Sequence, residues 1–270
     1  MTIPRQATIP ATEVITIKSK KVNQEYRISV ALPYSYPSKP RKRYPVIYLT
    51  DANYYFGMVT ELTRIMPICG EAPETIVVGI SYPVDEPLAT AFKRIGSLRA
   101  RDFTPVVDKK WQKEDPGIKT GGAGRFLRFI ETELIPLVEA KFRARSMDRI
   151  LAGHSLGGMF VLYTLFHQPN LFKGYLAASP AVDYLDNVLF KHESQFAKTH
   201  KSLPVKLYLG VGDREETTEI PAVSAMIQFA AQLESRKYKG FSLTRHIVDN
   251  CGHCASTAPT FQAGLQAVLT

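Results

Sequence analysis

Residues 149–158 read Arg149-Ile150-Leu151-Ala152-Gly153-His154-Ser155-Leu156-Gly157-Gly158, an apolar run that leads into a Gly-x-Ser-x-Gly pentapeptide. A stretch with helical spacing, 159–166, follows directly. A serine between two such glycines fits a turn too tight for neighbouring side chains, and the turn holds its hydroxyl above the end of a strand. The order of strand, turn and helix therefore predicts that Ser155 is an exposed nucleophile.

Short apolar strands alternate with helical stretches along most of the chain. Strands are expected at 46–49, 76–80, 150–152, 175–178, 205–209 and 241–248, and helices at 54–66, 125–142, 159–166, 221–233 and 261–269. Such alternation is typical of a mainly parallel sheet with helices on both faces. Before it, 12–17 and 26–30 alternate with the strand period and predict an antiparallel opening pair, while 33–43 reads as a surface loop.

These elements, with the serine turn after a central strand, predict the α/β-hydrolase fold. No repeat, low-complexity tract or Gly/Ser linker divides the 270 residues, and 45% of them are hydrophobic, so we expect a single domain over 1–270. In such sheets the active site lies at the carboxyl ends of the strands.

Composition narrows the classes of function. The net charge is +9, but the basic clusters at 41–43 and 109–110 are not interleaved with aromatic residues. This pattern indicates a solvated surface rather than a nucleic-acid site, with a weak preference for anionic substrates. No apolar run is long enough to span a membrane, and Met1 to Arg5 lead into no signal-peptide core. Three cysteines argue against a disulfide framework, so a cytoplasmic enzyme is expected.

A serine nucleophile needs a base and a group that orients the base. In this fold the acid follows the serine and the histidine comes last. Of six histidines, His253 lies in the loop after the last predicted strand, whereas His246 lies within that strand. We therefore expect His253 to be the general base.

The acid is expected after the strand at 205–209. Gly210-Val211-Gly212-Asp213 brings an aspartate to that strand end, and Glu215 and Glu216 follow. Asp213 is the predicted acid and Glu216 is the alternative. Another interpretation is that the acidic cluster caps the helix that starts near Pro221.

Two backbone N–H groups should stabilise the oxyanion of the tetrahedral intermediate. One is expected from Leu156, which follows the nucleophile. The other should come from the loop after the strand at 46–49, where Asn53 is the candidate and Ala52 the alternative.

A second motif, Cys251-Gly252-His253-Cys254, overlaps the predicted base. Cys-x-x-Cys motifs occur in thiol–disulfide enzymes, but there they open a helix after an early strand. Here the motif lies near the carboxyl end of the chain. A zinc site would lack a fourth ligand, because Cys69 is remote in sequence. We expect no metal and no cofactor.

Several segments resemble the esterase-D-like family, which includes S-formylglutathione hydrolases, feruloyl esterases, siderophore esterases and mycolyltransferases. The resemblance extends from about Tyr26 to the His253 loop. It rests on the segments 48–51, 101–105, 121–123, 153–158 and 179–180. The segments Arg101-Asp102-Phe103-Thr104-Pro105 and Gly121-Gly122-Ala123 are most similar to the siderophore-esterase branch. Asp51-Ala52 departs from the usual Asp-Gly, and this branch commonly has Glu where Asp213 stands.

The stretch 82–124 is expected to be a long loop on the catalytic side of the sheet. It carries Arg99, Asp102 and Phe103, which could build a pocket wall. The specific candidates for the substrate pocket are Asp51, Arg101, Trp111 and His154.

The sequence thus predicts a serine carboxylic-ester hydrolase that acts through an acyl-enzyme on short acyl, aryl or siderophore-type esters. Acyl transfer by the same residues is the alternative, and a non-catalytic binding protein of the same fold is a third reading. The expected partner is a small-molecule ester, with no nucleic acid and no membrane. The sequence leaves the oligomeric state open.

Overall fold

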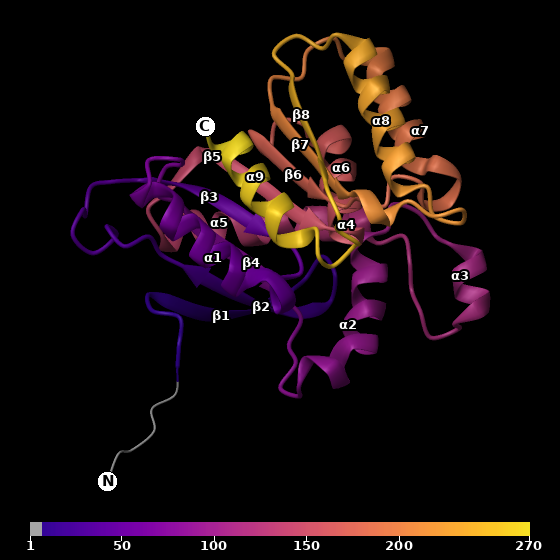
Figure 1. The fold of residues 1–270 in the computed structure, drawn as a ribbon. Coiled ribbons are helices and arrows are strands. Elements are labelled where there is room, and N and C mark those ends of the chain that lie inside the picture. Colours follow the sequence, from indigo (N-terminus) through magenta and orange to yellow (C-terminus); the bar gives the residue numbers. More distant parts are fainter. Residues whose placement is uncertain (1–6) are drawn as a thin grey trace.

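The computed structural model describes residues 7–270. The prediction about a signal peptide concerns the stretch that begins with Met1 to Arg5, and these residues lie outside that range. The strands are β1 (Thr12–Ser19), β2 (Gln24–Ala31), β3 (Tyr44–Leu49), β4 (Ile76–Ser81), β5 (Ala144–His154), β6 (Gly174–Ala178), β7 (Lys206–Gly212) and β8 (Ser242–Val248). The helices are α1 (Ala52–Ile68), α2 (Leu88–Phe103), α3 (Lys109–Glu114), α4 (Ala123–Phe129), α5 (Ile135–Lys141), α6 (Leu156–His167), α7 (Tyr184–Thr199), α8 (Ala222–Arg236) and α9 (Thr257–Leu269). Figure 1 shows their arrangement.

The strands form one sheet in the order β1-β2-β4-β3-β5-β6-β7-β8. β1 pairs antiparallel with β2, as the sequence predicts, and β2 pairs antiparallel with β4. From β4 to β8 every pairing is parallel. The central strands β3, β4 and β6 are buried along their whole length, which explains their continuous apolar sequences.

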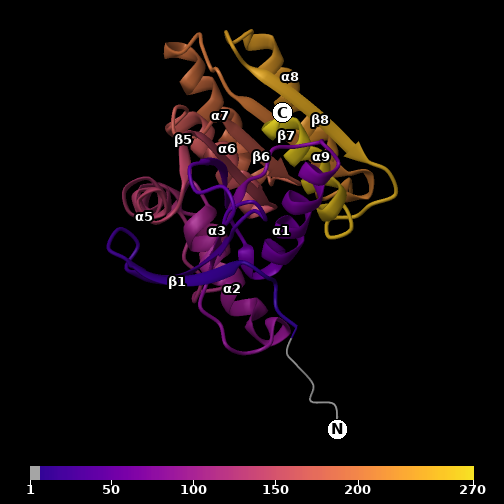
Figure 2. The ribbon, with the colours of Figure 1, turned by 90° about the vertical axis from the view of Figure 1, so that its left-hand side faces the viewer.

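Helices cover both faces of the sheet, in agreement with the sequence prediction. Helices α1 and α9 lie on one face, and α5, α6 and α7 on the other (Figure 2). Each face has its own core. Alternate residues of β3 supply the two cores: Ile47 and Leu49 face α1 and α9, while Val46 and Tyr48 belong to the larger core on the opposite side.

Helix α6 is the centre of the larger core. Ten of its residues, Gly157 to Phe166, are buried, because neighbouring helices cover the faces that the sheet leaves free. Phe160 packs within 6 Å, centroid to centroid, of the rings of Phe103 from α2 and Phe126 from α4. This packing fixes the helix that begins just after Ser155.

The prediction that 82–124 is a long loop is wrong in part, because the segment contains α2 and α3. Helix α2 buries Ala91, Ile95 and Phe103 along one side, and the spacing of these residues is that of a helix. The segment is therefore built around a helix that packs against α6 rather than around flexible chain.

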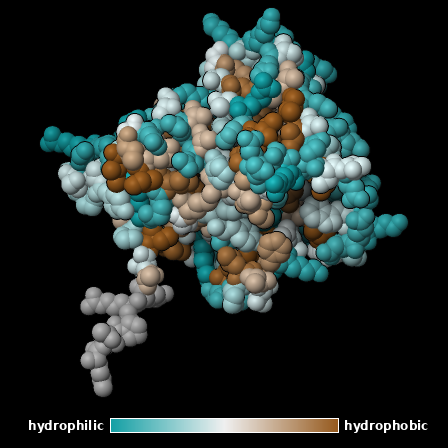
Figure 3. Space-filling model, viewed as in Figure 1, coloured by the Kyte–Doolittle hydropathy of each residue, from teal (hydrophilic) through white to brown (hydrophobic). Residues whose placement is uncertain are grey.

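Apolar side chains on the face seen in Figure 3 gather in separate patches within a largely hydrophilic surface. Within residues 7–270, no helix is both long and apolar enough to cross a bilayer.

The packing around α6 leads to a stability prediction. Phe160→Ala should lower the free energy of unfolding by about 3–5 kcal/mol, because Phe160 is fully buried among other aromatic rings. Urea denaturation followed by circular dichroism measures this loss. Met147→Ala is the control, since that side chain is 80% exposed. A loss below about 1 kcal/mol in Phe160→Ala would contradict the central place of α6.

Candidate active site

Ser155 lies in the turn between β5 and α6 with φ 60° and ψ −121°, a backbone conformation that non-glycine residues rarely adopt. Such local strain persists only where the surrounding structure imposes it. Here the Ser155 amide donates to the Ala178 carbonyl of β6 at 2.9 Å. A Cβ atom at Gly153 would overlap the Thr50 hydroxyl and the Gly157 carbonyl, so the turn closes only with glycine there.

An ion pair lies beneath this turn. Asp51 is fully buried and accepts two hydrogen bonds from Arg99, at 2.7 Å from Nε and 3.0 Å from Nη2. Gly157 faces the Asp51 carboxylate so closely that a Cβ atom there would lie 2.8 Å from Oδ2. Asp51 is therefore placed below the serine turn, and it is absent from the lining of the pocket for which the sequence proposed it.

His253 lies in the loop between β8 and α9, and its ring pairs with a carboxylate. The Nδ1 atom of His253 is 2.5 Å from Oε2 of Glu215. The Glu215 side chain is buried, whereas that of His253 is about half exposed. A carboxylate on Nδ1 holds the imidazole in the tautomer that leaves Nε2 free to accept a proton.

The predicted acids, Asp213 and Glu216, are not at this position. Asp213 is exposed and accepts a hydrogen bond from the Cys251 amide at 3.0 Å. Glu216 accepts from the backbone amides of Val223 and Ser224, so it caps α8, as the alternative interpretation of the acidic cluster proposed. The partner of His253 is the residue between them in sequence, Glu215.

The chain direction after β7 explains this correction. Residues Asp213–Glu215 form a 3₁₀ turn that folds the Glu215 side chain back onto the Gly212 amide, at 2.7 Å. Gly212 also lets the Cys251 carbonyl approach, since a Cβ atom there would overlap it. Because Gly212 has no side chain to complete a capping box with Glu215, the local sequence carries only a weak signal for this contact.

Glu215 is held as a carboxylate. Burial by itself raises its pKa, but hydrogen bonds from His253, the Gly212 amide, Ser179 and Ser256 outweigh that effect and lower the pKa to about 2. Ser179 Oγ and Ser256 Oγ donate to Oε1 at 2.8 and 2.9 Å. The negative charge is therefore maintained beside the imidazole at neutral pH.

Helix α6 begins at the serine turn, and α1 begins beside Asp51, which approaches that turn; both offer backbone donors. Leu156 is the first residue of α6, and Ala52 and Asn53 open α1. The first amides of a helix have no acceptor within it. The Asn53 side chain bonds the amide and the carbonyl of Tyr82, which fixes the start of α1 next to β4. Both Asn53 and Ala52 stay candidates for the second oxyanion donor beside Leu156.

A cavity of about 420 Å³ opens over Ser155 and His253. His154, predicted for the pocket, lines it, whereas Arg101 and Trp111 do not. The other lining residues are Tyr54, Tyr55, Met58, Phe92, Arg99, Cys254, Thr257 and Ala258.

Helix geometry explains why Arg99 reaches this cavity and Arg101 does not. Arg99 and Arg101 are two positions apart on α2, and such residues differ by about 200° in direction around the helix axis. Their side chains therefore leave α2 in nearly opposite directions. Arg101 binds Asp102 and, through Nη1, Gln24 at 3.0 Å. Trp111 lies on α3 and packs edge-on against Tyr184.

Cys251 and Cys254 are free thiols, as is Cys69. Across residues 7–270, no group of three or more His, Cys, Asp or Glu side chains is arranged to hold a metal ion.

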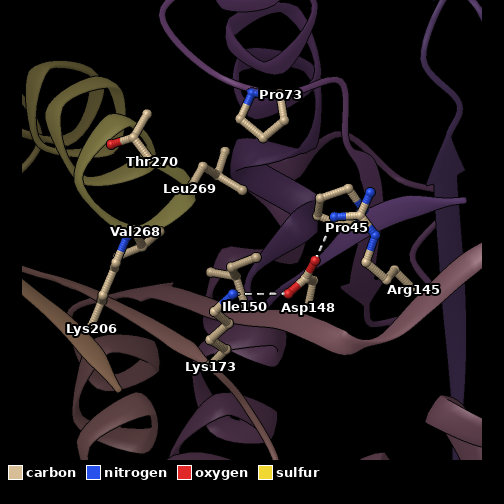
Figure 4. A pocket seen from close by; sticks show the side chains of 10 residues that line it. All are labelled: Pro45, Pro73, Arg145, Asp148, Ile150, Lys173, Lys206, Val268, Leu269 and Thr270. Atoms are coloured by element: carbon tan, nitrogen blue, oxygen red, sulfur yellow. Dashed lines mark hydrogen bonds and ion pairs between the residues drawn. The ribbon is translucent and has the colours of Figure 1, made fainter. Parts of the chain in front are cut away.

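A second cavity lies at the opposite edge of the sheet, where the strands begin. Its lining includes Pro45 of β3, Lys206 of β7 and the end of α9 (Figure 4). Asp148 there pairs with Arg145 and Lys173, at 2.6 and 3.1 Å. No serine, cysteine or histidine lines this second cavity.

The depressed pKa of Glu215 leads to a pH prediction. Between pH 4.5 and 2 the unfolded chain binds a proton at this carboxylate that the folded chain does not, so acid favours unfolding. Glu215→Gln removes this titration. The stability lost in Glu215→Gln should be fully present above pH 4.5 and should shrink as the pH falls toward 2, as urea denaturation at a series of pH values measures. A difference that stays constant below pH 4.5 would contradict the assignment.

Comparison with known proteins agrees with this geometry. The Esterase family model, described as "Putative esterase", matches residues 19–268. The ferri-bacillibactin esterase BesA of Bacillus subtilis is 36% identical over 221 residues, which cover 77% of this chain and 72% of BesA. The crystal structure of the BES protein from Bacillus cereus superposes with a TM-score of 0.87 at 27% identity, covering all of both chains. The siderophore hydrolase EstA from Aspergillus nidulans gives 0.78 at 25% identity, covering 98% of this chain and 97% of EstA.

These matches confirm the resemblance to the siderophore-esterase branch of this family that the sequence indicates. The chain belongs to the Esterase family and is a carboxylic ester hydrolase with the α/β-hydrolase fold.

Proposed function

We propose that the chain is a serine esterase whose catalytic residues are Ser155, His253 and Glu215. The observation that supports this most directly is the Glu215–His253 pair beside a cavity that Ser155 also lines. A serine in a strained turn, a histidine on the same cavity and a buried carboxylate on Nδ1 are the parts that acyl transfer requires.

In the proposed reaction, Ser155 Oγ attacks the ester carbonyl carbon while Nε2 of His253 takes the hydroxyl proton. The ionised Glu215 stabilises the imidazolium that forms. His253 then gives this proton to the departing alcohol oxygen, which leaves an acyl-enzyme on Ser155. A water molecule, deprotonated by the same imidazole, then attacks the acyl carbon. The bond between that carbon and Ser155 Oγ breaks, His253 returns the proton to Oγ, and the carboxylic acid leaves.

The developing oxyanion would bind the amide of Leu156 and an amide at the start of α1, from Asn53 or Ala52. Helix α6 begins directly after Ser155, and α1 begins directly after Asp51, which approaches Gly157, so the positive ends of two helix dipoles would favour negative charge near the serine. Each such donor contributes on the order of 3 kcal/mol to transition-state stabilisation.

We propose siderophore esters with aromatic acyl groups as the substrate class. Tyr54, Tyr55 and Phe92 give one side of the cavity an aromatic surface suited to a planar ring. The net charge of +9 favours an anionic substrate. Relatives named ferri-bacillibactin esterase and siderophore hydrolase support the same class.

Replacement of the nucleophile tests the reaction. Ser155→Ala should lower kcat/KM for a short-chain nitrophenyl ester, and for a siderophore trilactone, by about 10⁴-fold or more. The control is Cys251→Ser with Cys254→Ser, which should keep most of the activity because thiol chemistry has no part in the reaction. Full turnover by Ser155→Ala would refute the mechanism.

Replacement of the three neighbouring acids tests the assignment of Glu215. Glu215→Gln should lower kcat by about 10⁴-fold, since the imidazolium would lose its carboxylate. Asp213→Asn changes an exposed side chain that contacts backbone amides but not His253, so it should cost less than about tenfold, and the helix cap Glu216 should tolerate Gln. Steady-state kinetics of the three variants decide the matter. If Asp213→Asn is the most impaired, the original sequence prediction was right and this proposal is wrong.

A further inference from the structure

The residue before the nucleophile, His154, is buried and makes contacts that the proposed reaction does not use. Its side chain is 2% exposed at the end of β5. Nδ1 is 3.1 Å from the hydroxyl of Tyr55 on α1, and Nε2 is 3.0 Å from the carbonyl oxygen of His253. Thr257 at the start of α9 places its hydroxyl 3.3 Å from the same Nε2. One ring thus joins three parts of the chain that are distant in sequence.

These partners determine the tautomer of His154. A backbone carbonyl oxygen can only accept, so Nε2 must carry the hydrogen and donate it to His253. In a neutral ring Nδ1 is then bare, and it accepts the hydroxyl hydrogen of Tyr55. The neutral ring with its hydrogen on Nε2 therefore satisfies the contacts to Tyr55 and to the His253 carbonyl. With the hydrogen on Nδ1 instead, the lone pair of Nε2 would face the carbonyl oxygen of His253.

The contact to His253 is made to its backbone, while Glu215 holds its side chain. The two bonds together hold both the backbone carbonyl and the ring of His253. This matters because the loop leaves the His253 side chain about half exposed. Because His154 is covalently next to Ser155, its bond also ties the position of the base directly to the nucleophile turn. The positions of reacting groups affect rates steeply, and a displacement of about 1 Å can cost about 100-fold.

We propose that His154 is a positioning residue that sets the distance between Ser155 and His253 by donating a hydrogen bond from Nε2 to the His253 carbonyl. This role rests on the proposed function of Ser155 and His253. It differs from simple packing because it depends on a donor at one defined place, and not on the volume of the side chain.

The charge of His154 suits this role. The pKa of His154 is lowered to about 4, mainly because the ring is buried and also because His253 lies nearby. The ring is therefore neutral near pH 7. The two rings lie 4.5 Å apart, centroid to centroid. A neutral neighbour does not oppose the positive charge that His253 acquires during the reaction, whereas a protonated His154 would repel it.

Two amide variants of similar polarity separate positioning from packing. In His154→Gln the side-chain amide nitrogen can reach the place of Nε2 and donate to the His253 carbonyl. In His154→Asn the shorter amide reaches only the place of Nδ1, beside Tyr55. Both variants are assayed with a short-chain nitrophenyl ester, and their thermal unfolding midpoints are compared with that of the parent.

His154→Gln should keep kcat within about threefold of the parent, and His154→Asn should lose about tenfold or more. KM should change alike in both, because both alter the same pocket wall. The rate of acylation, measured in a single turnover with enzyme in excess, should slow only in His154→Asn. Equal kcat values for two folded variants, or a parental kcat in His154→Asn, would overturn the proposal.

A measurement on the unaltered protein keeps the proposal testable if His154→Asn fails to fold. The ¹⁵N chemical shifts of the His154 ring near pH 7 report which nitrogen bears hydrogen, and we expect it on Nε2. Hydrogen on Nδ1 would overturn the proposal whatever the variants do. Failure of the proposed function is distinguishable, because it would appear as full turnover by Ser155→Ala, while failure of the positioning role leaves Ser155→Ala inactive.

Discussion

The candidate site depends above all on the hydrogen bonds to the buried carboxylate of Glu215. Its two oxygens accept from the Gly212 amide at the end of β7, Ser179 after β6, Ser256 before α9, and His253. Burying a carboxylate costs free energy unless each oxygen accepts hydrogen bonds. The chain segments that follow β6, β7 and β8 must therefore come together for the fold to accommodate this charge. The hydrogen bonds that stabilise the charge of Glu215 also hold its carboxylate in the position that orients the His253 imidazole.

A second constraint is the lack of space around the serine turn. The turn needs glycine at 153 and 157 because Thr50 and the buried Asp51 approach it from β3. Arg99 on α2 neutralises Asp51 and also donates to the His154 carbonyl at 3.4 Å. Helix α2 thus supports the turn from below, and the guanidinium of Arg99 still lines the cavity.

Local patterns were enough to predict most of the fold and two of the candidate residues. Ser155 lies in a turn with a strong motif, and His253 follows the last strand, so chain order sufficed to select both. The acid was harder, because Asp213, Glu215 and Glu216 lie within four residues, and all three are compatible with a strand end. The 3₁₀ turn that separates their directions depends on the Cys251 carbonyl, 38 residues away from Asp213.

The sequence by itself determined the alternating strands and helices, the position of the serine turn and the order of the candidate groups, because these follow from local periodicity and from glycines that permit a strained backbone. Only the tertiary structure decided which acid meets His253, that Arg99 rather than Arg101 reaches the cavity, and that His154 joins the serine turn to the His253 loop. Each of these depends on the direction of a side chain relative to a partner distant in sequence, and packing between elements sets that direction.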